Sequence, residues 1–142
     1  MTIRIKYVYI VSIMKYVYPV IFEEDEGKIG VTVPDIPSTY TFGEDMADAI
    51  YMAQDVIAMM LADYEDNGKE VPKPSKIEDI KTTGTVSLVV ADTDEWRKLV
   101  DNKAVKKTLT IPSWLNKKAE RSAINFSQTL QDALCQKLGV FQ

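Results

Sequence analysis

The side chains best suited to bind a ligand lie near the carboxyl end of the chain, on one face of a short predicted strand. Leu109 and Ile111 are two residues apart, which is the spacing of one face of a β-strand. The opposite face is polar, basic and free of carboxylates, and it carries three residues: Lys106, Thr108 and Thr110. Side chains of these types can donate hydrogen bonds to base edges and phosphates. This face is therefore the first candidate for a binding site.

Two helices are predicted to follow this strand. Pro112 lacks a backbone donor and ends the strand, yet proline is well tolerated in the first turn of a helix, so a helix is expected over residues 113–122. A second helix is expected to begin after Asn125, whose side chain can accept hydrogen bonds from first-turn amides. The Gln128 side chain is expected to bond back to the Asn125 amide, which would complete a capping box. Its apolar residues recur at helical spacing, with a glycine as the C-terminal cap: Phe126, Leu130, Ala133, Leu134, Leu138 and Gly139.

A strand–helix–helix unit of this size, residues 103–142, needs a partner. A lone strand leaves both edges unpaired, and so small a segment rarely buries a sufficient core. Two copies can pair their strands into an antiparallel ribbon whose apolar face covers four helices and whose polar face points outward. Because a two-stranded ribbon fits the DNA major groove, we expect a homodimer that binds palindromic DNA.

Residues 107–120 and 124–134 resemble a ribbon-helix-helix repressor domain, in the form carried by HicB-family antitoxins. The resemblance implies that the three polar strand residues enter the major groove and that Lys107 lies at the edge with its ammonium reaching outward. Backbone amides at the start of the second helix would contact a phosphate. The DNA-binding residues expected on this basis are Lys106, Lys107, Thr108, Thr110, Asn125 and Phe126.

Charge divides the 142-residue chain at about residue 102. The formal net charge of the chain is −4. The front part has 10 basic and 19 acidic residues, a net charge of −9, and the end of the chain has 7 basic and 2 acidic residues, a net charge of +5. A basic end suits phosphate, and an acidic front suits a basic protein. The alternative for the front is solvated charge that only keeps the protein soluble.

The front part, residues 14–102, is predicted to form three strands, a long helix, a fourth strand in the same sheet and a short helix. Polar residues 23–28 are expected to form the first turn, with Glu44 or Asp45 capping the long helix and Thr93 or Asp94 the short one. The strands and the short helix should cover residues 16–22, 29–33, 39–42, 85–92 and 95–100. The long helix should end at Gly68 and carry one apolar face: Met46, Ala49, Ile50, Ala53, Ile57, Met60, Leu61 and Tyr64. Residues 1–13 are expected to be an extension or an extra edge strand.

The order β-β-β-α-β resembles a shortened ribonuclease-H-like fold, as in the HicB amino-terminal domain. Four segments are similar to motifs of that family, namely residues 31–37, 41–45, 49–61 and 68–75. The chain departs from the family pattern at Ser38, where glycine is usual, and at Glu44, where aspartate is commoner. The expected fold class is therefore α+β, a partial ribonuclease-H-like domain followed by a ribbon-helix-helix domain.

The resemblance implies a toxin partner of the HicA type, a small basic RNA-cleaving protein with a double-stranded-RNA-binding-like fold. The residues expected to contact it are Glu23, Asp25, Asp35 and Pro37. For Asp35, a role as a turn former between prolines is the alternative. The protein is then predicted to neutralise the toxin and repress its own operon. The alternatives are a repressor with a ligand-sensing front domain and no toxin, or a metal-dependent nuclease.

Catalysis by this chain is not expected. It contains no histidine, the front carboxylates are predicted to lie in a turn and a loop rather than in strands, and no cofactor or metal site is indicated. Its one cysteine, Cys135, allows no internal disulfide. No run approaches the roughly 20 apolar residues that span a bilayer, so a cytoplasmic location without membrane contact is predicted.

Overall fold

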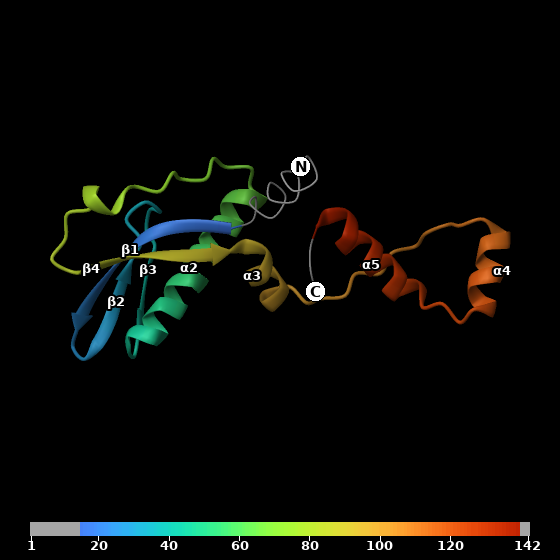
Figure 1. The fold of residues 1–142 in the computed structure, drawn as a ribbon, viewed down its shortest axis with the longest axis horizontal. Helices are drawn as coiled ribbons and strands as arrows, with labels where there is room; N and C mark the ends of the chain where they lie inside the picture. The colour runs from blue at the N-terminus through green and yellow to red at the C-terminus, as the bar shows by residue number, and fades with distance from the viewer. Residues whose placement is uncertain (1–14, 140–142) are drawn as a thin grey trace, which may run out of the picture. The chain divides into compact units, whose positions relative to one another are not determined.

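The computed structural model describes residues 15–139, so the expected extension at residues 1–13 lies outside the described residues. The chain divides into two compact units between Asn102 and Lys103. We call residues 15–102 the front unit and residues 103–139 the carboxy-terminal unit (Figure 1). Each is described by itself.

The front unit is built on a four-stranded antiparallel sheet with the strand order β3-β2-β1-β4. The strands are β1 (Lys15–Asp25), β2 (Lys28–Thr32), β3 (Tyr40–Gly43) and β4 (Thr85–Asp92). Pairs such as Phe22 with Val31 and Tyr18 with Val89 fix the register of β1 against its two neighbours. The predicted order of three strands, a helix and a fourth strand in the same sheet is confirmed.

The turn between β1 and β2 is shorter than predicted. Only Glu26 and Gly27 connect the strands, with φ angles of 49° and 82°. Positive φ at both central residues is what a type I′ hairpin requires, and its twist matches that of the strands. The expectation that Glu23 and Asp25 lie in a turn is therefore wrong: both belong to β1, and Asp25 pairs with Lys28.

Helix α2 (Met46–Asp66) covers one face of the sheet (Figure 1). Asp45 caps it by accepting from the Asp48 amide at 2.8 Å, as predicted. The apolar face was only partly predicted, because Met46 and Ile50 are exposed. Small residues let the helix approach the sheet closely, and the buried residues are Ala49, Ala53, Ile57, Ala58, Leu61 and Ala62. A Cβ on Gly43 would lie 2.2 Å from the Ala49 nitrogen, so β3 must end in glycine.

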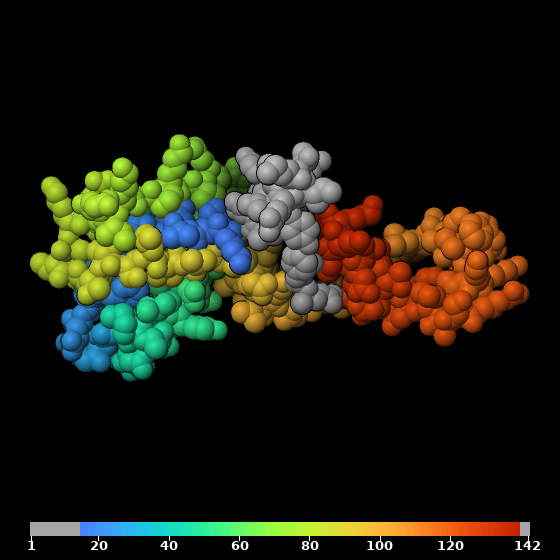
Figure 2. Space-filling model, viewed as in Figure 1, coloured from blue at the N-terminus to red at the C-terminus, as the bar shows by residue number. Residues whose placement is uncertain are grey.

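The segment between α2 and β4, residues 67–84, is called the connector. Its second residue is the expected glycine: Gly68 follows the C-cap Asn67 with φ 61°, and the Lys69 amide donates to the Tyr64 carbonyl, as in a Schellman motif. It also contains a 3₁₀ turn that was not predicted, η1 (Ile77–Asp79). The connector lies against β1 (Figures 1 and 2), because the Tyr18 hydroxyl donates to the Pro72 carbonyl and a Cβ on Gly84 would meet β1.

Helix α3 (Thr93–Val100) directly follows β4. The predicted caps, Thr93 and Asp94, are wrong. Asp92 is the cap, and its carboxylate accepts from the amides of Asp94 and Glu95 at 3.0 and 3.1 Å. The strand thus supplies the capping residue of the helix, which removes any need for a loop between them.

Glu65 ties three elements of the front unit together. Its carboxylate accepts from the Tyr16 hydroxyl at 2.6 Å, from the Thr93 hydroxyl at 3.1 Å and from the Arg97 guanidinium at 2.7 Å. Burial and the hydrogen bond to Glu65 raise the pKa of Tyr16, and the same carboxylate raises the pKa of Arg97. Arg97 also pairs with Asp66 at 2.6 Å. These contacts join β1, α2 and α3.

The carboxy-terminal unit contains α4 (Ser113–Arg121) and α5 (Phe126–Leu138), close to the predicted bounds. Asn125 caps α5 by accepting from the Gln128 amide at 3.1 Å, and Gly139, with φ 67°, ends the helix, both as predicted. The capping box is wrong, since the Gln128 side chain donates to Asp132 at 2.7 Å instead. An i, i+4 bond along the helix surface competes with the return bond to the cap.

The predicted strand at residues 106–111 is not formed in the single chain, where residues 103–112 have no regular secondary structure. The prediction required a second copy as pairing partner, and no neighbouring strand of the same unit takes that place among the described residues. No described residue of this unit is buried. The unit therefore lacks a core of its own.

We expect Glu65→Gln to lower the free energy of unfolding by about 1–3 kcal/mol, because the substitution removes the charge from hydrogen bonds to three side chains on β1 and α3. Chemical denaturation near neutral pH measures the change. Glu70→Gln, at an exposed position of the connector, is the matched control and should change stability by less than about 0.5 kcal/mol. Equal effects of the two substitutions would contradict the assigned role of Glu65.

Candidate protein-binding and nucleic-acid interfaces

The sheet face opposite α2, called here the outer face, carries two exposed aromatic side chains on the edge strand β3. Tyr40 is 76% exposed and Phe42 is 55% exposed. Paired residues of neighbouring strands point to the same side of a sheet. The register therefore places Phe42, Gly30 and Glu23 in one row across three strands, and Tyr40, Thr32 and Ile21 in the next.

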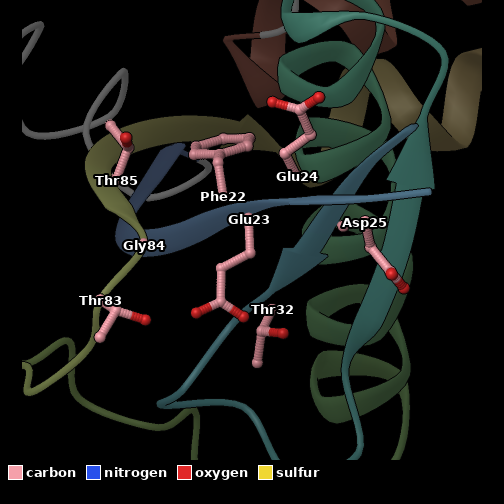
Figure 3. Close-up of a pocket in the computed structure, with 9 residues that line it drawn as sticks. Phe22, Glu23, Glu24, Asp25, Thr32, Thr83, Gly84 and Thr85 are labelled. Atoms are coloured by element: carbon pink, nitrogen blue, oxygen red, sulfur yellow. The ribbon is translucent and has the colours of Figure 1, made fainter. Parts of the chain in front are cut away.

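A groove of about 610 Å³ runs over this region. It is lined by Phe22, Glu23, Glu24, Asp25, Gly30, Thr32, Thr83, Gly84 and Thr85. Figure 3 shows the side chains of Glu23 and Thr32 on one side of the sheet and those of Phe22 and Glu24 on the other, so the Glu24 carboxylate borders the groove without sharing the face of Glu23. Gly84 lets the connector form one wall, since a Cβ there would lie 2.8 Å from the Phe22 carbonyl oxygen. The groove is thus defined by a close approach of the connector to β1.

The groove is acidic. The Glu23 carboxylate accepts from the Thr82 hydroxyl at 3.2 Å. The Lys28 ammonium lies 4.7 Å from the centre of the Phe42 ring and is paired with Glu44 at 2.7 Å. Residues 15–102 together hold 19 acidic and 8 basic side chains, a net charge of −11. This surface attracts cations and repels phosphate.

The four predicted toxin contacts do not form one cluster. Glu23 and Asp25 lie at the hairpin end of β1, whereas Asp35 and Pro37 lie in the loop at the other end of β2. Asp35 is used within the unit: its carboxylate accepts from the Ser75 amide at 2.9 Å and the Ser75 hydroxyl at 2.5 Å. These bonds favour a structural role for Asp35, and its contact with a partner stays a prediction.

Ser38, in the same loop, has φ 57°, in the left-handed region that favours glycine. A non-glycine residue there costs about 1 kcal/mol or more. The backbone is therefore strained at Ser38, the position where the family pattern usually has glycine.

The predicted DNA contacts lie in an open part of the carboxy-terminal unit. Residues 103–112, which include Lys106, Lys107, Thr108 and Thr110, are all exposed. The Asn125 side chain accepts from the Gln128 amide, and the contact of backbone amides at the start of α5 with a phosphate stays a prediction. Beside these residues is an apolar groove of about 390 Å³, lined by Ile111, Leu115, Lys118, Ala119, Ser122, Ile124, Phe126 and Thr129.

Among residues 15–139, no group of three or more acidic, histidine or cysteine side chains is arranged to hold a metal ion. The carboxylates of β1 do lie in a strand, contrary to the sequence-based expectation, but Glu23 and Glu24 point to opposite faces (Figure 3). No helix in this part of the chain is long and apolar enough to cross a membrane.

Sequence reasoning missed Gly30, Tyr40 and Phe42 as surface residues of interest. The alternation of Tyr40, Thr41 and Phe42 indicated a two-faced strand. Which face was open could not be read from it, since that depends on the side taken by α2. The row formed with Glu23 depends on the strand register.

Comparisons with known proteins agree with this mixed α+β architecture. The chain resembles a chain of a toxin–antitoxin complex from Streptococcus pneumoniae, with a TM-score of 0.55, 31% identity and coverage of 87% of this chain and 99% of that chain. It also resembles the Burkholderia pseudomallei antitoxin HicB, with a TM-score of 0.51, 25% identity and coverage of 87% and 98%. The class of protein is thus that of antitoxins with an amino-terminal antiparallel sheet followed by helices.

The family is shown by sequence. Residues 18–136 match the model of the HicB-like antitoxin of bacterial toxin–antitoxin systems. Antitoxin HicB 2 of Photorhabdus laumondii subsp. laumondii is 41% identical over 58 residues, which cover 41% of this chain and 42% of that protein. An uncharacterized 14.9 kDa protein of Haemophilus phage HP1 is 26% identical over 99 residues, covering 69% of this chain and 74% of that protein. The chain belongs to the HicB-like antitoxin family.

Ser38→Gly should raise the free energy of unfolding by about 0.5 kcal/mol, because relief of the left-handed strain exceeds the entropy cost of glycine. Denaturation curves of the two proteins measure the difference. Ser87→Gly in β4 is the control: this exposed strand residue does not have a positive φ, so the same substitution should destabilise. Destabilisation by Ser38→Gly would contradict the strain argument.

Proposed function

We propose that this antitoxin binds and neutralises a small, basic, RNA-cleaving toxin of the HicA type and represses its own operon by binding palindromic DNA. The observation that carries the proposal is the division of charge between two units of an antitoxin. The front unit has a net charge of −11, and the part of the chain from Lys103 onward has a net charge of +5. Opposite charges in one chain suit partners of opposite sign.

The front unit is the proposed toxin-binding part. An RNA-cleaving protein needs a basic surface for phosphate, and an acidic protein surface can occupy that place. Exposed aromatic side chains such as Tyr40 and Phe42 are of the kind enriched in protein interfaces. The order of elements in this unit supports a partial ribonuclease-H-like fold. We propose that the unit shares this fold but does not carry out nuclease chemistry.

The carboxy-terminal unit is the proposed DNA-binding and dimerisation part. This unit exposes an apolar groove and the side chains of Leu109, Leu134 and Leu138. Exposed apolar surface of this kind is typical of an interface with another chain. A second copy would cover this surface, with residues 106–111 of each chain paired as a ribbon. Lys106, Thr108 and Thr110 would then face the major groove together. Contacts between front units of such dimers would give a higher oligomer.

Replacement of Lys106, Thr108 and Thr110 by alanine should weaken binding to DNA from upstream of the gene by about 100-fold or more, since each base contact contributes about 1–3 kcal/mol. Fluorescence anisotropy measures the affinity at fixed salt. Neutralisation of the toxin, measured by growth on co-expression, should survive. Lys137→Ala, which removes one charge at the far end of α5, should keep most of the DNA affinity. Loss of both activities in a folded triple variant would contradict the division of labour.

A fragment ending at Asn102 should still co-purify with the toxin, because it retains the whole sheet, α2 and α3. Its circular dichroism and melting curve verify that it is folded. The fragment should show no affinity for the upstream DNA. A folded fragment that fails to retain the toxin would move the toxin site to the carboxy-terminal unit.

A further inference from the structure

We propose that the toxin docks on the outer face of the front sheet, with one of its arginine or lysine side chains lying over Gly30 between Phe42 and Glu23. This assignment rests on the proposed function, since it presumes a basic toxin. It adds the surface and the chemistry of contact, which the charge of the unit alone does not specify.

Gly30 creates the space for that side chain. It stands between Phe42 on β3 and Glu23 on β1 in one cross-strand row. A Cβ at Gly30 would come no nearer than 3.4 Å to the Glu23 carbonyl oxygen, and its φ is not in the left-handed region. Neither packing nor backbone conformation therefore requires glycine here, in contrast with Gly43. What glycine does provide is an open trough across β2.

The two walls of the trough suit a cationic side chain. An aromatic ring attracts a cation over its face, and a carboxylate forms charge-assisted hydrogen bonds with it. Lys28 already lies over the Phe42 ring, with its ammonium 4.7 Å from the ring centre, so this ring accepts a cation over its face. A cation of the toxin would displace Lys28 from this face or use the opposite face of the ring. The ammonium of Lys28 is paired with Glu44 at 2.7 Å, and no ion pair joins it to Glu23. Within the described residues Glu23 is paired with no cation, and its carboxylate accepts a hydrogen bond from the neutral Thr82.

The charge of the front unit selects a basic protein over other occupants. Nucleic acid would meet 19 carboxylates against 8 cations and be repelled. A second copy would bring the same net charge of −11 to the same surface. A basic protein gains from the field, and its apolar atoms can bury Tyr40 and Phe42, the kind of aromatic anchors that dominate interface energies.

Two neighbouring carboxylates provide a matched test. Glu23→Gln and Glu24→Gln remove the same charge from adjacent residues of β1, but the two side chains point to opposite faces (Figure 3). Glutamine at position 23 keeps an acceptor for Thr82. Full-length antitoxin and the purified basic protein encoded beside its gene are the partners, and titration calorimetry at fixed salt gives the dissociation constant.

Glu23→Gln should weaken binding by about 10-fold or more, whereas Glu24→Gln should stay within about 2-fold of the wild type. Gly30→Val fills the trough with a strand-favouring residue and should weaken binding by at least 10-fold without lowering the melting temperature. Tyr51→Ser, which removes an exposed aromatic residue from α2, should leave the affinity unchanged.

The possible outcomes distinguish an error in the proposed docking surface from an error in the proposed function. If wild-type antitoxin binds and both Glu23→Gln and Gly30→Val bind equally well, the outer-face assignment is overturned while the antitoxin function stands. Equal weakening by Glu23→Gln and Glu24→Gln would overturn it too, because the effect would then be one of net charge. If the wild-type protein fails to bind the toxin, the result contradicts the proposed function itself.

Discussion

The close packing of α2 on the sheet is the constraint on which the front unit depends. Ala49 and Ala53 are fully buried, and Gly43 leaves no room for a Cβ beside the helix backbone. Close approach of this kind requires small residues where β3 meets the start of the helix, whereas Ile57 and Leu61 are buried further along it and Met46 and Ile50 remain exposed. By fixing which face of the sheet is covered, the packing also fixes which face stays open to a partner.

The outer face follows from that packing and from the path of the connector. After α2 the chain returns over residues 67–84, so that β4 enters antiparallel beside β1. Glu65 holds the start of β1 and α3 at the end of the helix, while Gly84 brings the connector against the other end of β1. A groove with Glu23 at its centre results. The site is thus made by elements far apart in sequence.

The two units solve different physical problems. The front unit has a buried core and an excess of negative charge, whereas the carboxy-terminal unit has a basic surface and no buried residue among those described. A unit without a core gains stability only by association. We therefore propose that DNA binding by this unit depends on dimerisation, because the same pairing that would cover its apolar side chains would form the basic face.

The sequence by itself determined the parts that depend on local chemistry. The caps at Asp45 and Asn125, the end of α2 shortly before Gly68 and the four strands of the front unit follow from side-chain types and spacing over a few residues. Tertiary structure alone decided the two-residue hairpin that places the β1 carboxylates in a strand, and the row of Glu23 with Gly30 and Phe42. The reason is that pairing register, and the choice of face covered by α2, depend on contacts between distant segments that no local pattern contains.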